Sequence, residues 1–262
     1  MGKFTGQDAE SPQPTGVRAV KSAERTIALL EYLSAADQPR SLRDVTSDLG
    51  IPRASAYALL MTLVNSGWVE PDAAGSRYSL GIRALRVGAS YVEHDDVVRQ
   101  AQRVMDEISQ EWGETVHLAR LHGNEIVYLA TCISRHSLAV VSRPGRRLPC
   151  YGTGLGKALL AERPWAETDA LLPEILQART VHTITDRAAL RDELRRVRER
   201  GYAIDEQEST IGLRCFAVSL DFGGGSVPKE ALSFSIPIVR LDADRERDIV
   251  KALLEARDRI VR

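Results

Sequence analysis

The stretch that decides the N-terminal fold is residues 41–69, SLRDVTSDLGIPRASAYALLMTLVNSGWV. Ser41, followed three residues later by Asp44, has the form of a capping box and predicts the start of a short helix. Gly50 predicts its end, because glycine adopts the left-handed conformation of a helix C-cap at little cost. A proline two residues further on marks the start of another helix, expected over residues 53–65. Two helices separated by so tight a turn predict a helix-turn-helix unit.

The flanking residues complete this unit. Apolar residues at helical spacing from Ile27 to Leu33 predict a first helix. Residues 68–70 and 77–80 are rich in strand-forming residues and flank the turn 72–76, which predicts a β-hairpin. Three helices and a hairpin form a winged helix-turn-helix, with residues 53–65 as the helix that enters the major groove.

The faces of this third helix suggest which residues contact DNA. Large apolar residues at helical spacing predict the packed face, and they are Tyr57, Leu60, Met61 and Val64. Short polar and cationic side chains at the start of such a helix read base edges, while nearby arginines bind phosphates. The candidate DNA contacts are Arg40, Arg43, Arg53, Ser55, Tyr57 and Arg77.

Charge limits the kind of DNA binding that is expected. The 262 residues contain 35 Lys and Arg and 36 Asp and Glu, a net charge of −1, which excludes a polybasic coat protein. High affinity therefore requires a local contact surface, doubled by dimerisation. A trihelical unit of this kind also serves as a protein-interaction module, so a DNA-independent interaction protein is an alternative.

The rest of the chain mixes helices and strands, which predicts a second domain and an α+β fold class overall. Two helices are expected within residues 82–112, with a break near residues 94–96. Strands are expected at residues 115–120, 125–132, 137–142, 202–205, 214–220 and 230–237, and helices at residues 154–161, 168–176, 186–200 and 244–260.

These patterns set the expected domain boundaries and environment. We expect a disordered tail over residues 1–16, a DNA-binding domain over 17–81, a linker helix over 82–95 and a second domain over 96–262. No apolar run is long enough to span a membrane. The three cysteines show no zinc or disulfide spacing, which favours the cytoplasm and no metal site.

A glycine-rich segment and a cysteine are candidates for chemistry. Residues 151–157, YGTGLGK, match neither the Walker A spacing nor a dinucleotide fingerprint. A glycine-rich helix start still suits a small carboxylate, and a plain tight turn is the alternative. Cys215 as a nucleophile would make the protein an enzyme, but no hydrolase or protease motif accompanies it. We expect no catalytic residues and no cofactor.

Several segments together resemble the IclR family of bacterial transcriptional regulators. The most specific is GYAIDEQE at residues 201–208, followed by CFAVSL at 215–220. The other segments are residues 20–30, residues 51–60, residues 78–81 and GLGKALLA at 154–161. The resemblance covers residues 17–262.

The resemblance implies a winged helix, a linker helix and a GAF-like effector-binding domain with a six-stranded sheet, assembled as a dimer or tetramer. Ser233 and Ser235 alternate along one strand and so point to the same side, where hydroxyls can bind a small acid. Asp205 would favour a ligand hydroxyl. The implied effector pocket consists of Gly154, Leu155, Asp205, Cys215, Ser233 and Ser235, with apolar walls from Leu138, Val140 and Leu213.

Three positions depart from the family pattern. Ala58 stands where relatives often carry Arg, which affects the operator contact, and Phe216 and Ser219 are expected to reshape the wall beside Cys215. The resulting hypothesis is a cytoplasmic, homo-oligomeric regulator whose affinity for operator DNA changes when it binds a small organic acid. The identity of the acid, and whether the protein represses or activates, stay open.

Overall fold

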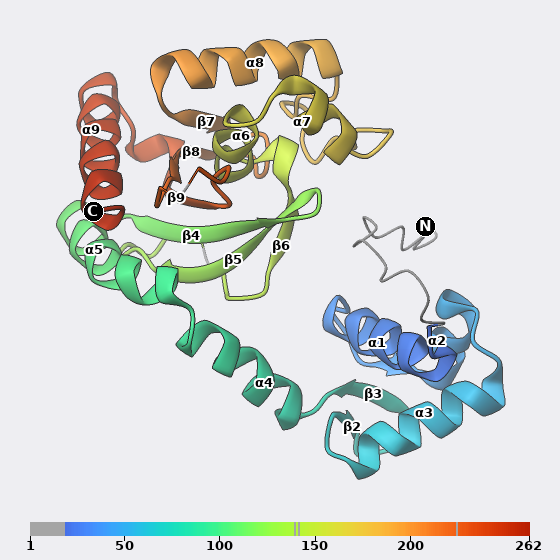
Figure 1. Ribbon diagram of the computed structural model, residues 1–262. Helices are drawn as coiled ribbons and strands as arrows, with labels where there is room; N and C mark the ends of the chain where they lie inside the picture. The colour runs from blue at the N-terminus through green and yellow to red at the C-terminus, as the bar shows by residue number, and fades with distance from the viewer. Residues whose placement is uncertain (1–18, 139, 141, 224) are drawn as a thin grey trace. The chain divides into compact units, whose positions relative to one another are not determined.

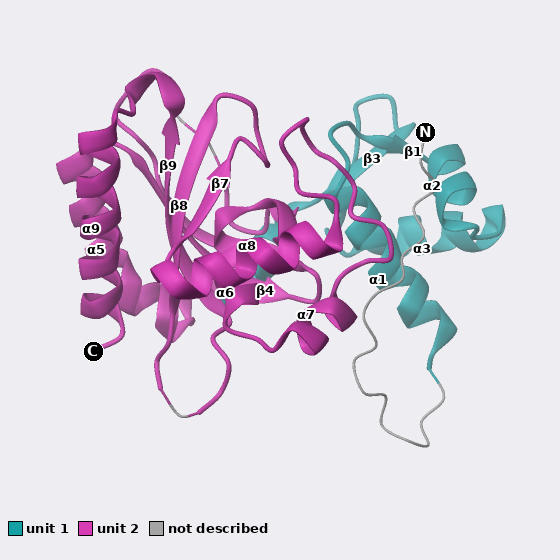
Figure 2. Ribbon diagram, turned by 90° about the horizontal axis from the view of Figure 1, so that it is seen from above, with its two compact units in different colours: residues 1–91 teal, residues 92–262 magenta. Residues whose placement is uncertain are grey.

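The computed structural model describes residues 19–138, 140, 142–223 and 225–262, so the tail expected over residues 1–16 lies outside the described residues. Two compact units divide the chain at residues 91 and 92, coloured separately in Figure 2. Each unit has its own hydrophobic core.

Unit 1 contains the predicted three helices and hairpin (Figure 1). The Ser41 hydroxyl accepts a hydrogen bond from the Asp44 backbone N–H at 3.2 Å, while the Asp44 carboxylate accepts one from the Ser41 N–H at 2.8 Å. Gly50 ends the second helix with φ of 63°. The elements are α1 (Lys21–Ser34), β1 (Arg40–Ser41), α2 (Leu42–Leu49), α3 (Arg53–Asn65), β2 (Val69–Pro71), β3 (Arg77–Leu80) and α4 (Ile82–Glu93), with the antiparallel strand order β1-β3-β2.

The packed face of α3 differs from the prediction. Its buried residues are Ala56, Leu60 and Leu63, whereas Tyr57 is 52% exposed. The apolar pattern was anchored on the large Tyr57, although the small Ala56 is the residue that packs. A shift of one residue turns the face of a helix by about 100°, so the assignment of Tyr57 to the core was wrong.

Two consecutive helices, α4 and α5 (Asp96–Trp112), follow the winged helix-turn-helix, as predicted. Asp95 ends the interruption between them, because its carboxylate accepts a hydrogen bond from the Val98 N–H at 3.1 Å and caps α5. The helix α4 buries none of its residues, although one side is apolar.

Unit 2 contains a six-stranded antiparallel sheet with the strand order β6-β5-β4-β9-β8-β7. The third strand along the chain is β6, not residues 137–142, whose described members form no strand. The helix expected at 168–176 instead spans residues 165–171, because Pro164 precedes its first turn and the backbone is already extended at Leu172. The elements are β4 (Thr115–His122), β5 (Glu125–Cys132), β6 (Arg147–Pro149), η1 (Cys150–Gly152), α6 (Gly154–Ala161), α7 (Trp165–Leu171), α8 (Arg187–Arg200), β7 (Ala203–Glu206), β8 (Leu213–Leu220), β9 (Glu230–Pro237), η2 (Ile238–Arg240) and α9 (Ala243–Ile260).

Helices cover both faces of this sheet. The helices α5 and α9 lie side by side over one face (Figure 2), and α6 and α8 pack over the other. Phe216 belongs to the core under α5 and α9, while its neighbour Cys215 faces the opposite side. Successive residues of a strand alternate between faces, so the expectation that Phe216 shapes the wall beside Cys215 was wrong.

Candidate functional site

The register of the sheet aligns polar residues of four strands in one row. Asp205 of β7 is paired with Cys215 of β8, which is paired with Ser235 of β9, and Ser235 is paired with Thr115 of β4. Directly paired residues of antiparallel strands project from the same face. A polar strip therefore crosses the sheet on the side that α6 covers.

A second row lies beside the first and combines small and polar residues. Ala217 is paired with Ser233, which is paired with His117 of β4. His117 is buried, and its Nδ1 lies 3.0 Å from the hydroxyl of Thr131. Burial lowers the pKa of His117 to about 3, so this imidazole is neutral near pH 7. The two rows together form the floor of the candidate site. The sequence pattern suggested that His117 is an ordinary strand residue and did not predict its place in this floor.

The start of α6 lies directly against this floor. A Cβ atom on Gly154 would lie 3.4 Å from the Cβ of Ala217. A Cβ on Gly156 would lie 2.0 Å from the carbonyl oxygen of Cys150, so this contact requires glycine. Thr153 caps the helix by accepting a hydrogen bond from the Gly156 N–H at 3.1 Å.

Two backbone hydrogen-bond donors at the start of α6 have no acceptor in the described part of the chain. Among the described residues, no acceptor binds the backbone N–H groups of Gly154 and Leu155. The N-terminal end of a helix carries partial positive charge from such unsatisfied N–H groups. It therefore favours an anion or a hydrogen-bond acceptor at this position.

A small cavity of about 30 Å³, room for about one water molecule, lies between the floor and α6. The six residues expected to bind the effector all line it, together with Val140 and Leu213. Leu138 does not line it and is 59% exposed. The lining residues that sequence reasoning missed are Tyr128, Arg146, Leu148, Thr153, Ser209 and Thr210.

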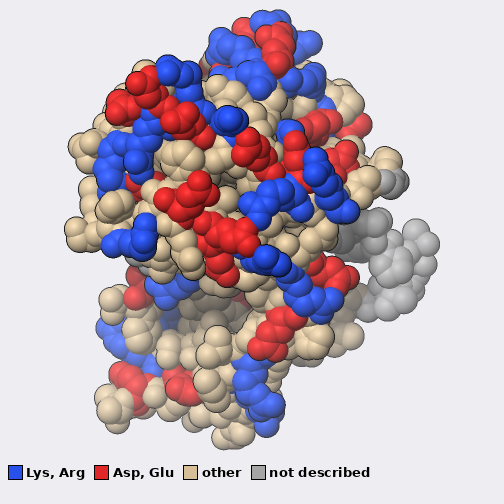
Figure 3. All heavy atoms as spheres, turned by 90° about the vertical axis from the view of Figure 1, so that its left-hand side faces the viewer, with Lys and Arg blue, Asp and Glu red and all other residues tan. Residues whose placement is uncertain are grey.

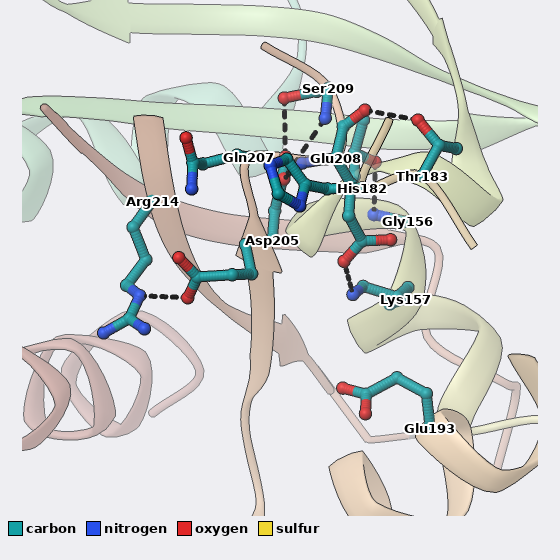
Figure 4. A network of polar contacts seen from close by, with 12 residues as sticks. Gly156, Lys157, His182, Thr183, Glu193, Asp205, Gln207, Glu208, Ser209 and Arg214 are labelled. Atoms are coloured by element: carbon teal, nitrogen blue, oxygen red, sulfur yellow. Dashed lines mark hydrogen bonds and ion pairs between the residues drawn. The ribbon is translucent and has the colours of Figure 1, made fainter. Parts of the chain in front are cut away.

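The Asp205 carboxylate is already occupied by the loop that follows β7. One oxygen accepts hydrogen bonds from the backbone N–H groups of Glu208 at 2.7 Å and Ser209 at 3.2 Å. The other accepts from the Ser209 hydroxyl at 2.6 Å (Figure 4). Burial raises the pKa of Asp205, and these hydrogen bonds oppose the shift. In this structure Asp205 holds Ser209 at the cavity.

A buried ion pair stands behind this loop. The ammonium group of Lys157 on α6 contacts the Glu208 carboxylate, and their side chains are 1% and 4% exposed (Figure 4). Burial raises the pKa of Glu208, whose second carboxylate oxygen has no partner in the described part of the chain. The signal for this pair was a single lysine within an otherwise uncharged helix, GLGKALLA.

The Cys215 thiol lacks the surroundings of a nucleophile. It is buried, with its Sγ 3.2 Å from the hydroxyl of Ser235. Burial and the neighbouring Asp205 carboxylate raise the pKa of this thiol far above its usual range. The thiolate is the reactive form of cysteine, so the geometry favours a packing or ligand-contact role.

The candidate DNA contacts in unit 1 fall on different surfaces. Arg53 and Tyr57 are exposed and four residues apart, so they share one face of α3, whereas Ser55 is half-buried and lies off that face. Arg43 is exposed on α2. The Arg40 guanidinium lies 5.6 Å from the centre of the Tyr32 ring. Arg77 on β3 is exposed and donates a hydrogen bond to the carbonyl oxygen of Pro39 at 3.2 Å.

A winged helix-turn-helix unit followed by a separate domain with a polar cavity defines a class of DNA-binding transcriptional regulators. Two family models match this chain. The IclR helix-turn-helix domain matches residues 22–73, and the bacterial transcriptional regulator IclR C-terminal domain matches residues 89–262. The chain belongs to the IclR family of transcriptional regulators.

Similar proteins cover nearly the whole chain. The HTH-type transcriptional regulator KdgR of Escherichia coli is 32% identical over 243 residues, 92% of each chain. The HTH-type transcriptional repressor AllR of Escherichia coli is 33% identical over 236 residues, 89% of this chain and 86% of AllR. The crystal structure of an IclR transcriptional regulator from Alicyclobacillus acidocaldarius superposes with a TM-score of 0.82 at 25% identity, over 93% of this chain and 98% of that one.

The relatives share one class of function. They are named as transcriptional regulators and repressors, and none of these names describes an enzyme. No helix within the described ranges is both long and apolar enough to cross a membrane. The protein is a DNA-binding transcriptional regulator with an N-terminal helix-turn-helix domain and a C-terminal IclR effector domain.

Proposed function

We propose that a small organic acid binds in the cavity between the sheet and α6 and changes the affinity of this regulator for its operator DNA. The observation that carries the proposal is that residues from α6, β7, β8 and β9, distant in sequence, line one polar cavity. The free N–H groups of Gly154 and Leu155 suit a carboxylate, and the hydroxyls of Ser233 and Ser235 suit further polar groups of the same ligand.

The cavity favours a ligand whose binding moves its rim. A volume of about 30 Å³ is too small for an organic acid. Arg146 and Val140 lie on the rim, and Arg146 is exposed. A guanidinium group that closes over a carboxylate forms a bidentate, charge-assisted contact. Ligand binding would thus favour an arrangement of this rim that differs from the one described, and we propose that this preference changes the affinity for DNA.

We also propose that the protein binds DNA as a homodimer or homotetramer. The side chains of Ile82, Leu85, Val87 and Tyr91 on α4 are between 56% and 66% exposed. A contiguous apolar helix face of this kind favours burial against another subunit. Pairing also doubles the phosphate contacts of a unit with little net positive charge. A regulator that acts on chromosomal DNA works in the cytoplasm, and the proposal therefore includes a cytoplasmic location.

The DNA part of the proposal is tested by fluorescence anisotropy with a duplex from the upstream region of the gene and an unrelated duplex. We expect specific binding to exceed nonspecific binding by about a thousandfold. Arg53→Ala, on the exposed face of α3, is expected to weaken operator binding by about tenfold or more. The matched control is Arg247→Ala, which removes an exposed arginine of α9. Equal losses in both variants would contradict a recognition role for Arg53.

The effector part is tested by screening organic acids for a change in operator affinity. We expect Ser235→Ala to weaken the response to the active acid while operator binding without the acid stays unchanged. The control is Ser219→Ala, because the Ser219 hydroxyl donates a hydrogen bond to Glu162 and does not line the cavity. Equal responses of Ser235→Ala and the wild type would contradict binding in this cavity.

A further inference from the structure

A second and larger hollow lies on unit 2, away from the effector cavity. It measures about 310 Å³, lies among α6, α7 and α8, and shares no lining residue with that cavity. Four arginines line it, together with apolar residues that include Trp165 and Leu194. We call it the arginine groove, and its arginines are Arg163, Arg191, Arg195 and Arg198.

Two of these guanidinium groups are held in place by neutral partners. Arg163 donates hydrogen bonds to the carbonyl oxygens of Leu159 at 2.6 Å and Pro228 at 3.1 Å. Arg198 donates to the carbonyl oxygens of Ala161 at 2.8 Å and Arg163 at 3.0 Å. Carbonyl acceptors orient a guanidinium group without neutralising it, so both positive charges remain.

The positive charges of the other two arginines are at most weakly compensated by nearby carboxylates. The Arg191 guanidinium lies 5.8 Å from the centre of the Trp165 ring, which orients it but carries no countercharge. Arg195 forms an ion pair with Asp192 at 3.1 Å, and both side chains are more than half exposed. Within the described chain, Arg195 is thus the one member of the groove with a carboxylate partner.

This pattern differs from that of other arginines of unit 2. Arg214, for example, contacts the carboxylates of Glu206 and Glu246. The carboxylates that act electrostatically on Arg163 are those of Glu167 and Glu162, and neither residue lines the groove. On the face in Figure 3, basic side chains gather at the top, where α8 lies in Figure 1, with acidic side chains among them. The groove itself retains a positive charge excess.

We propose that the arginine groove is a second ligand site, for a small organic anion that carries two or more phosphate or carboxylate groups. Several fixed guanidinium groups favour a multiply charged anion, because each can form a charge-assisted hydrogen bond with it. The volume matches a small metabolite, whose carbon skeleton would pack on Trp165 and Leu194. The groove shares no lining residue with the effector cavity, so the proposal does not depend on a ligand bound there.

Isothermal titration of the full-length protein with inorganic pyrophosphate, and separately with citrate, tests this site. The two anions distinguish a preference for phosphate from one for carboxylate groups. We expect saturable binding of at least one of them. The double variant Arg191→Gln/Arg195→Gln is expected to bind it at least about tenfold more weakly. Both arginines are exposed and hold no backbone group, so the fold is expected to persist, which a thermal melt checks.

The matched control is Arg103→Gln/Arg247→Gln, which removes two exposed arginines outside the groove that pair along their own helices. It is expected to bind as the wild type does. The proposal is overturned if neither anion shows saturable binding at millimolar concentration, or if the groove variant binds as tightly as the control. It is also overturned if an oligoglutamate peptide binds through Arg191 and Arg195 while both small anions do not, because the groove would then recognise a protein.

Discussion

The DNA-binding surface of unit 1 and the cavity of unit 2 are built in opposite ways. The residues Arg53 and Tyr57 lie one helical turn apart on a solvent-exposed face of α3. The cavity of unit 2 joins α6 to three strands that follow it along the chain, and most of its polar groups are buried. Substitutions on the first surface are therefore expected to change binding alone, whereas substitutions around the cavity also change folding.

The two units differ in the same way in the placement of charge. Unit 2 buries Lys157 against Glu208 and keeps the imidazole of His117 neutral in the sheet. The capping carboxylate of Asp44 in unit 1 stays partly exposed. Burying charge is costly unless a partner is present, so unit 2 depends on precise pairing and unit 1 on local turns.

The largest effect is expected from Lys157→Met, which leaves the Glu208 carboxylate buried without its partner. We expect unit 2 to lose about 3–5 kcal/mol of unfolding free energy. Urea unfolding followed by fluorescence measures this in a Trp68→Phe background, where the remaining tryptophans, Trp112 and Trp165, report on unit 2. The double variant Lys157→Met/Glu208→Met should lose less, because no charge is stranded. A single variant as stable as the wild type would contradict a structural role for the pair.

Gly156→Ala tests the close approach of α6 to the chain before it. The added methyl group meets the backbone of Cys150, which cannot rotate away, so we expect a loss of about 1–3 kcal/mol by the same urea assay. Gly88→Ala in α4 is the control, since nothing lies within 4 Å of its added methyl group. Gly88 belongs to unit 1, so this variant is followed through Trp68 in a Trp112→Phe/Trp165→Phe background. That substitution is expected to be neutral or to stabilise by up to about 1 kcal/mol. Similar losses in both variants would contradict the steric argument.

The pH dependence of stability tests the neutral state of His117. Its pKa is about 3 in the folded protein and about 6.5 when unfolded, so the unfolded state binds the extra proton between these values. Stability from this group is therefore present above pH 6.5 and decreases as the pH falls toward 3, by up to about 1.4 kcal/mol per pH unit.

The comparison is urea unfolding of the wild type and His117→Gln at pH 7 and pH 5. Burial raises the pKa of Asp205 and Glu208, and their contribution has the opposite sign, but both proteins share it. The wild type should therefore lose more stability than the variant at the lower pH. Parallel losses in the two proteins would show that His117 is not held neutral by burial.

The smallest effect is expected from Ser41→Ala, which removes the hydroxyl that caps α2. We expect unit 1 to lose about 1 kcal/mol. A Trp112→Phe/Trp165→Phe background leaves Trp68 as the reporter of unit 1. Unit 2, followed in the Trp68→Phe background, should be unchanged. A loss of unfolding free energy in unit 2 would contradict the view that this cap stabilises unit 1 only locally.

Local signals explain what could be predicted from the sequence. The capping box at Ser41 and the left-handed Gly50 act within a few residues, and both are present in the structure. Strand alternation placed Ser233 and Ser235 on one side, and both line the cavity. The same alternation, applied to Phe216, would have moved it to the opposite face, where it packs under α5 and α9.

The sequence by itself determined the order of most elements, the winged helix-turn-helix and the family, because caps, turns and periodic apolar residues act over short distances. Only the tertiary structure decided which distant groups meet. Lys157 and Glu208 are 51 residues apart, and Arg163, which precedes α7, meets three arginines of α8 in one groove. Such contacts depend on strand register and helix packing, and a single sequence carries no local signal of either.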